Sequence, residues 1–114
     1  MKKLKISITG CLGRMGTQLI KTAKKNKHLQ IESVTERKTA KKKKIRNLKI
    51  LKNSLSAFKD TSVIIDFTTP NCTIEVLKIA KQLRKKIVIG TTGFSPKQEK
   101  YIKNISKFIP VLKA

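Results

Sequence analysis

Aromatic residues are scarce in this 114-residue sequence, which has no Trp, one Tyr and four Phe. The chain therefore lacks the interleaved aromatic side chains on which single-stranded nucleic acids stack. The two cysteines, Cys11 and Cys72, are far apart and have no neighbouring metal ligands, which favours reduced thiols and no metal site. No apolar run reaches the roughly 18 residues of a membrane span. We therefore expect a globular protein in the cytoplasm with no membrane partner.

Acidic residues are also few. Six Asp and Glu against 28 Lys and Arg give a formal net charge of +22. Such a charge is typical of proteins that bind nucleic acid or another polyanion. The basic residues are spread over nearly the whole chain, however, which favours a general drift of composition towards Lys. Charge alone thus leaves a basic nucleic-acid-binding module as an alternative function.

The densest basic stretch runs from Arg37 to Arg46, where seven of ten residues are Lys or Arg, including the run Lys41–Lys44. Repulsion between these charges predicts a solvated loop, with room for a short helix at most. The sequence offers no partner for this run.

Apolar residues make up 39% of the chain and recur in short blocks. Their spacing predicts strands at 4–9, 29–36, 49–51, 62–67, 87–90 and from 109, and helices at 14–27, 54–60, 68–86 and 95–107. The expected inner faces of three helices are Met15, Leu19, Ile20 and Ala23; Ile74, Leu77, Ala80 and either Leu83 or Arg84; and Ile102, Ile105 and Phe108. This alternation predicts an α/β fold: one domain, residues 1–114, with a doubly wound parallel sheet and helices on both faces.

The stretch "ITGCLGRMG" (8–16) places three glycines three residues apart between a predicted strand and a predicted helix. Gly10 would let the chain turn sharply, Gly13 would let a diphosphate approach the backbone, and Gly16 would let the helix pack on the sheet. Free N–H groups at the helix start attract phosphate. A Rossmann-like dinucleotide site is therefore predicted here, with a plain tight turn as the alternative.

An acid is expected about 20 residues after such a turn, and Glu36 follows Gly16 by that interval. Its carboxylate would accept hydrogen bonds from the adenosine ribose. Arg37 and Lys38 come next and could bind a 2′-phosphate. NADH or NADPH is thus the expected cofactor, and a solvated Glu-Arg pair on a loop is the alternative.

A second glycine turn, "IGTTGF" (89–94), ends another predicted strand and would lie at the nicotinamide half of the cofactor. A purely structural turn remains open there. Asp66, at the end of a buried strand, is expected to brace a loop rather than act as a general base. Cys72 lies near a helix start, which could lower its pKa. His28 lies at the opposite end of the predicted sheet and is assigned no catalytic role.

Together, "GCLGRMG", "DFTTP" and "IGTTGF", with "TER" between the first two, resemble the cofactor-binding domain of the 4-hydroxy-tetrahydrodipicolinate reductase family. The resemblance implies an NADH- or NADPH-dependent oxidoreductase of the diaminopimelate route to lysine. It places Glu36 and Arg37 at the adenosine ribose and its phosphate, and Phe67 and Thr68 along the same cleft. The pyrophosphate side would be formed by Gly10, Cys11, Leu12, Gly13, Arg14 and Met15, and the nicotinamide side by Gly90, Thr91 and Thr92.

Two departures from the family pattern accompany the resemblance. Asn71 stands where the family usually has Glu, and the stretch from Arg37 to Leu48 is shorter and more basic than is typical. The chain also ends at Ala114, before the family's substrate domain with its His pair and Lys. We therefore assign no catalytic residue and expect the 114 residues alone to be nearly inactive, without the family's homotetramer or a bound dicarboxylate substrate. A non-catalytic dinucleotide sensor is a further alternative.

Overall fold

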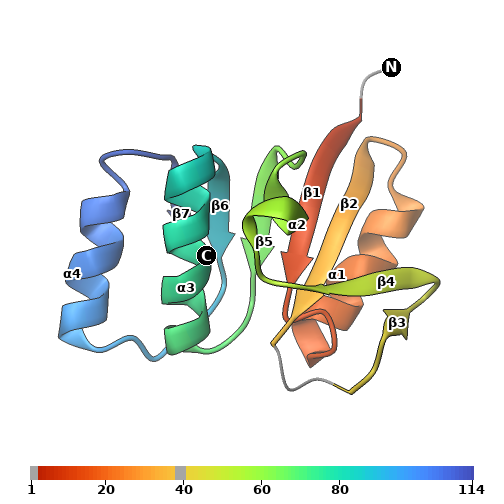
Figure 1. The fold of residues 1–114 in the computed structure, drawn as a ribbon, viewed down its shortest axis with the longest axis horizontal. Helices are drawn as coiled ribbons and strands as arrows, with labels where there is room; N and C mark the ends of the chain where they lie inside the picture. The colour runs from red at the N-terminus through yellow and green to blue at the C-terminus, as the bar shows by residue number, and fades with distance from the viewer. Residues whose placement is uncertain (1–2, 38–40) are drawn as a thin grey trace.

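A computed structural model describes residues 3–37 and 41–114 (Figure 1). Its strands and helices follow the predicted order. In chain order they are β1 (Leu4–Thr9), α1 (Arg14–Lys25), β2 (Leu29–Glu36), β3 (Lys44–Ile45), β4 (Leu48–Lys52), α2 (Leu55–Phe58), β5 (Val63–Asp66), α3 (Pro70–Leu83), β6 (Lys86–Ile89), α4 (Pro96–Ile105) and β7 (Val111–Lys113). Lys38, which the sequence placed beside a 2′-phosphate, lies outside the described residues.

The strands form one sheet in the order β3-β4-β2-β1-β5-β6-β7. From β4 to β7 every neighbouring pair is parallel. The chain starts at the central strand β1, moves outward to β2 and β4, and then crosses back to β5 on the other side of β1. This reversal makes the sheet doubly wound, as predicted, and ligands in such folds bind at the carboxyl ends of the strands where the order reverses.

In its described residues, 37 and 41–46, the predicted loop contains a short strand and none of the helix that was allowed there. β3 pairs antiparallel with β4 through a tight turn in which Arg46 and Asn47 both have positive φ values, of 47° and 68°. Left-handed residues at both centre positions are typical of two-residue hairpins. Ile45 is buried against the core beneath β2, and Lys24 Nζ on α1 donates to the Arg46 carbonyl. Burial of one isoleucine therefore outweighs the charge repulsion of its neighbours.

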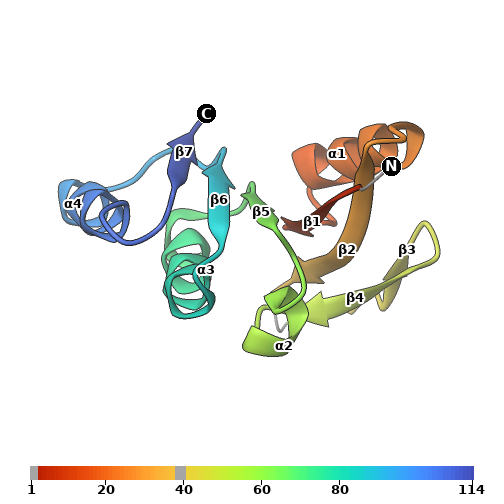
Figure 2. The same ribbon diagram turned by 90° about the horizontal axis from the view of Figure 1, so that it is seen from above.

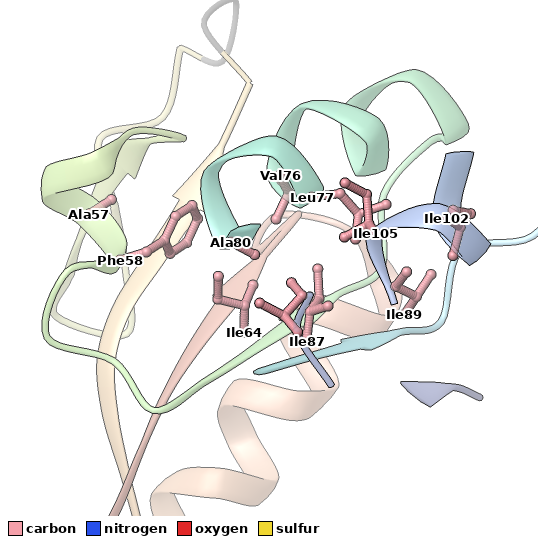
Figure 3. Close-up of a cluster of buried hydrophobic side chains, with 11 residues drawn as sticks. Ala57, Phe58, Ile64, Val76, Leu77, Ala80, Ile87, Ile89, Ile102 and Ile105 are labelled. Atoms are coloured by element: carbon pink, nitrogen blue, oxygen red, sulfur yellow. The ribbon is translucent and has the colours of Figure 1, made fainter. Parts of the chain in front are cut away.

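The helices cover both faces of the sheet, as predicted. Figure 2 shows α1 on one side and α2, α3 and α4 on the other. Under α1, Ile20 and Ala23 pack with Ile6, Ile8 and Val34 of the central strands. The second core lies between α2, α3, α4 and the β5–β6 half of the sheet (Figure 3), and it is formed by Ala57, Phe58, Ile64, Val76, Leu77, Ala80, Ile87, Ile89, Ile102, Ile105 and Ile109.

Two of the predicted core residues are wrong. Met15 is 48% exposed because it lies in the first turn of α1, above the edge of the sheet. Phe108 is 60% exposed, since α4 ends at Ile105 and the chain then turns, which buries Ile109 in its place. The Phe108 ring instead lies under Lys81, whose Nζ is 4.3 Å from the ring centroid.

The inner face of α3 also differs from the predicted one. Thr73 and Val76 are buried there together with the predicted Leu77 and Ala80, whereas Ile74 and Leu83 are partly exposed.

Within residues 3–37 and 41–114, none of the helices has both the length and the apolar character needed to cross a bilayer.

Candidate functional site

A cavity of about 440 Å³ opens at the carboxyl ends of β1, β2 and β5, where the strand order reverses. This volume lies within the range of small-molecule sites, ~300–1,000 Å³. It is lined by Gly10, Leu12, Gly13, Glu36, Arg37, Phe67, Thr68, Thr69 and Cys72. The fold thus brings together the glycine turn, the end of β2 and the loop after β5.

The glycine turn on one wall of the cavity depends on two of its three glycines for steric reasons. Gly10 has a φ of +66°, and a Cβ there would lie 2.5 Å from the Phe67 carbonyl oxygen. A Cβ on Gly16 would lie 2.1 Å from the Gly10 carbonyl oxygen, so Gly16 lets α1 pack against the turn. The sequence had suggested that it lets the helix pack against the sheet. Gly13 has only that same oxygen near it, at 3.3 Å, and faces open space.

The start of α1 can bind an anion. Gly13 is its N-cap and supplies no side-chain hydrogen bond, whereas Thr69 caps α3 and Ser95 caps α4 through their hydroxyls. The first N–H groups of any helix, here from Arg14 onward, have no acceptor within the helix. No acidic side chain lies in this first turn, so α1 itself supplies no negative charge to its positive end.

Glu36 joins the end of β2 to the glycine turn. Its Oε2 accepts a hydrogen bond from the Leu12 amide at 3.0 Å, and its Oε1 accepts one from the Arg37 amide at 3.0 Å. The carboxylate is partly exposed and lines the cavity, so it can also accept hydrogen bonds from a ligand hydroxyl. Arg37 is exposed at the rim.

Asp66 lies beneath the cavity at the end of β5 and is 0% exposed. Its carboxylate accepts hydrogen bonds from the hydroxyls of Thr9, Thr68, Thr73 and Thr91. We call these five residues the Asp66 cluster. Asp66 therefore braces the loops around it, as the sequence suggested, and it points into the protein rather than into the cavity.

The second glycine turn is separated from the cavity by an aromatic ring. Phe67 lies so close to Gly90 that a Cβ added there would be 1.8 Å from Phe67 Cε1. Thr91 is 7% exposed because its hydroxyl turns down into the Asp66 cluster, while Thr92 is exposed. Gly90, Thr91 and Thr92 consequently do not line the cavity.

Seven of the predicted site residues line the cavity and six do not. The lining ones are Gly10, Leu12, Gly13, Glu36, Arg37, Phe67 and Thr68, and the others are Cys11, Arg14, Met15, Gly90, Thr91 and Thr92. Cys11 is fully buried, and Arg14 and Met15 are exposed at the start of α1. Sequence reasoning did not assign Thr69 and Cys72 to the site, although Thr69 directly follows "DFT" and Cys72 comes three residues later, in the first turn of α3.

The predicted lowering of the Cys72 pKa is wrong. Burial has the largest effect and raises the pKa of the Cys72 thiol. A hydrogen bond with Thr68 opposes it, the carboxylates of Asp66 and Glu75 raise the pKa further, and a hydrogen bond with Asn53 lowers it slightly. Burial and the charge of Glu36 likewise raise the pKa of Cys11 to about 11. In the described part of the chain, no group of three or more His, Cys, Asp or Glu side chains could hold a metal ion.

The chain matches known proteins over its whole length. The family described as dihydrodipicolinate reductase, N-terminus, matches residues 4–114. The 4-hydroxy-tetrahydrodipicolinate reductase of Pelagibacter ubique is 56% identical over 114 residues, which is 100% of this chain and 44% of that protein. The enzyme of the same name from Buchnera aphidicola subsp. Cinara cedri is 42% identical over 96% of this chain and 44% of its own length. The chain thus spans less than half of these relatives.

Solved structures share the fold. Dihydrodipicolinate reductase from Paenisporosarcina sp. with bound dipicolinate superposes with a TM-score of 0.74 at 22% identity, covering 91% of this chain and 43% of that one. Homoserine dehydrogenase from S. aureus superposes with a TM-score of 0.78 at 15% identity, covering 100% of this chain and 33% of that one. Because the family match runs from residue 4 to residue 114, the chain belongs to the family of the dihydrodipicolinate reductase N-terminus.

Proposed function

We propose that this chain is the cofactor-binding part of an NADH- or NADPH-dependent reductase of 4-hydroxy-tetrahydrodipicolinate. The observation that carries the proposal is the position of Glu36, which lies at the mouth of the same cavity as the uncapped start of α1. An acceptor for sugar hydroxyls beside a phosphate-binding helix start is what a dinucleotide requires. The relatives named 4-hydroxy-tetrahydrodipicolinate reductase support the choice of reaction.

The adenosine half of the cofactor would be held at the cavity. N–H groups of the first turn of α1, from Arg14 to Gly16, would donate to the diphosphate, and Gly13 leaves room for it because it has no side chain. Glu36 would accept from the ribose hydroxyls, and the Arg37 guanidinium would bind a 2′-phosphate. Either cofactor fits this arrangement, since Glu36 would bind the ribose hydroxyls of NADH and Arg37 would bind the 2′-phosphate of NADPH.

The nicotinamide half would extend past Phe67 towards Gly90, Thr91 and Thr92. When bound, the reduced nicotinamide supplies the hydride for the cyclic dicarboxylate substrate. Phe67 excludes water from one side of this path, and the exposed Thr92 offers a hydroxyl at its end. The chain spans 44% of the Pelagibacter relative, and none of its residues is assigned a role in substrate binding or proton transfer.

The test is a titration of NADH and of NADPH, followed by the rise in nicotinamide fluorescence, with the wild-type chain and two variants. Arg37→Ala should weaken NADPH about tenfold and NADH much less, because only NADPH carries the 2′-phosphate. Glu36→Ala should weaken NADH more than NADPH. Lys100→Ala, which removes an exposed charge on α4, is the control for non-specific attraction.

Wild-type protein that binds neither cofactor would refute the proposal. If it instead bound duplex DNA with an affinity that falls steeply with salt, the basic nucleic-acid-binding alternative would be correct. Among the described residues, the charged side chains that line the cavity are one Glu and one Arg, so its lining does not favour that alternative.

A further inference from the structure

Asp66 is a buried carboxylate with no part in holding the cofactor as proposed above. It accepts from four hydroxyls that come from separate elements: Thr9 ends β1, Thr68 follows β5, Thr73 lies in α3 and Thr91 follows β6. One side chain thus joins three neighbouring strand ends and a helix. These ends carry the glycine turn, the loop along the cavity and the second glycine turn.

The Asp66 cluster is held by hydroxyls and not by a cation. Within residues 3–37 and 41–114 the ion pair found joins Lys113 and Glu99, on the surface. A buried carboxylate must have its oxygens hydrogen-bonded, and two oxygens offer about four acceptor positions. Four hydroxyls, each with one proton, fill these positions. Removing one hydroxyl therefore leaves a vacancy that no other group of the cluster can fill.

Thr91 is the member that connects the two glycine turns. Its hydroxyl lies 3.2 Å from Asp66 Oδ2 and 3.0 Å from Thr73 Oγ1, and it accepts a hydrogen bond from the Thr68 amide at 2.8 Å. Thr68 lines the cavity, whereas Thr91 directly follows Gly90, whose amide donates to the Asp66 carbonyl at 2.8 Å. The Thr91 side chain thus ties the second glycine turn to the loop along the cavity, beside the backbone pairing of β5 and β6.

We propose that the Asp66 cluster is a positioning device that fixes the spacing between the two halves of the dinucleotide site. This inference rests on the proposed function. The adenosine half would bind at the turn after Thr9, and the nicotinamide half at the turn that contains Thr91. A dinucleotide spans both turns, so a shift of one turn loses the contacts of one half only. Thr91 is accordingly a positioning residue and not a cofactor contact.

The experiment compares NADH with ADP-ribose, which lacks the nicotinamide, by calorimetric titration. In Thr91→Val the side chain keeps its shape and loses its hydroxyl. NADH should bind about three- to tenfold more weakly, because the second glycine turn loses the three hydrogen bonds of this hydroxyl, while ADP-ribose should stay within about twofold of wild type. Thr73→Val should also weaken NADH more than ADP-ribose, and it replaces Thr91→Val in the experiment if that variant does not fold.

Thr61→Val is the matched control. Thr61 is also buried, at 1% exposure, and its hydroxyl donates to the Lys5 and Val63 carbonyls at the opposite end of β5. It should lower stability but leave the ratio of NADH to ADP-ribose affinity unchanged. Equal weakening of both ligands in Thr91→Val, or no weakening, would overturn the positioning role. Wild-type protein that binds neither ligand would instead refute the proposed function itself.

Discussion

The ring of Phe67 lies directly on the backbone of Gly90, in the space that any larger residue would need for its Cβ. The two residues follow neighbouring parallel strands, β5 and β6, whose ends are paired through Asp66 and Ile89. This contact puts an aromatic wall between the cavity and the second glycine turn.

Gly90→Ala should displace this ring, because the new methyl group would lie 1.8 Å from Phe67 Cε1. Overpacking of this kind typically costs about 1–3 kcal/mol. The free energy of unfolding, from urea denaturation, should fall by that amount. In the double variant with Phe67→Leu, most of the loss should be recovered; if it is not, the ring contact is not the reason that Gly90 is needed.

Gly16→Ala and Gly13→Ala test the two sides of the first glycine turn. A methyl group on Gly16 would lie 2.1 Å from the Gly10 carbonyl oxygen, which is backbone and cannot move away, so we expect a loss of at least about 2 kcal/mol. On Gly13 the same oxygen is 3.3 Å away, and the loss should stay below about 1 kcal/mol. Equal losses in urea denaturation would contradict the packing described here.

Cys72 reports on occupancy of the cavity because its thiol is partly exposed there, whereas Cys11 is fully buried. Iodoacetamide should modify Cys72 faster than Cys11 in the native protein, and bound dinucleotide should slow the modification of Cys72. The raised pKa of Cys72 means that its thiolate fraction at pH 8 is below that of a free cysteine, so its rate should keep rising above pH 9. Peptide mass spectrometry would measure both sites, and an unchanged Cys72 rate with saturating cofactor would exclude binding at this cavity.

Cys11 should make stability depend on pH in the alkaline range. Its pKa is raised from 9.0 to about 11 on folding, so the folded state binds this proton more tightly than the unfolded state. Its contribution is fully present below pH 9 and is lost as the pH rises towards 11, by at most about 3 kcal/mol. The measurement is the difference between wild type and Cys11→Ala, which isolates the thiol from all other groups. A pH-independent difference would show that the thiol keeps its usual pKa in the folded chain.

Ser7 and Ser33 form a buried hydroxyl pair, 2.6 Å apart, at the point where the register of β1 and β2 shifts. Ser7→Ala would leave the Ser33 hydroxyl without this partner and should cost about 1–3 kcal/mol. The double variant Ser7→Ala/Ser33→Ala removes both groups and should cost less than the sum of the single variants. Additive losses would mean that the two hydroxyls do not stabilise each other.

Much of the fold could be predicted because the signals for it are local. Ser95, Pro96 and Gln98 predict the start of α4, and the structure has the reciprocal hydrogen bonds of that capping box. The continuous apolar run around Ile64 predicts a central parallel strand, and β5 lies between β1 and β6. Met15 and Phe108 were assigned wrongly, since helical periodicity gives a face but not the point at which a helix leaves the core.

For the site, the sequence could predict which backbone segments come together but not where their side chains point. Parallel strands bring their carboxyl ends together, which places Gly10, Glu36 and Thr68 at one cavity whatever their side chains do. The direction of Thr91 depends on a carboxylate 25 residues away in the sequence, at Asp66, and no spacing rule reports on it. The pKa of Cys72 was misjudged for a similar reason: the helix start was visible in the sequence, and the extent of burial was not.

The hairpin of β3 and β4 also affects how the protein behaves at high concentration. Unpaired strand edges are templates for other chains, and proteins shield them with short strands and lysines. β3 is two residues long, Lys41 to Lys43 precede it, and Lys44 is its first residue. This edge of the sheet is therefore short and strongly positive. A second molecule could form few backbone hydrogen bonds with it and would be repelled by the like charge.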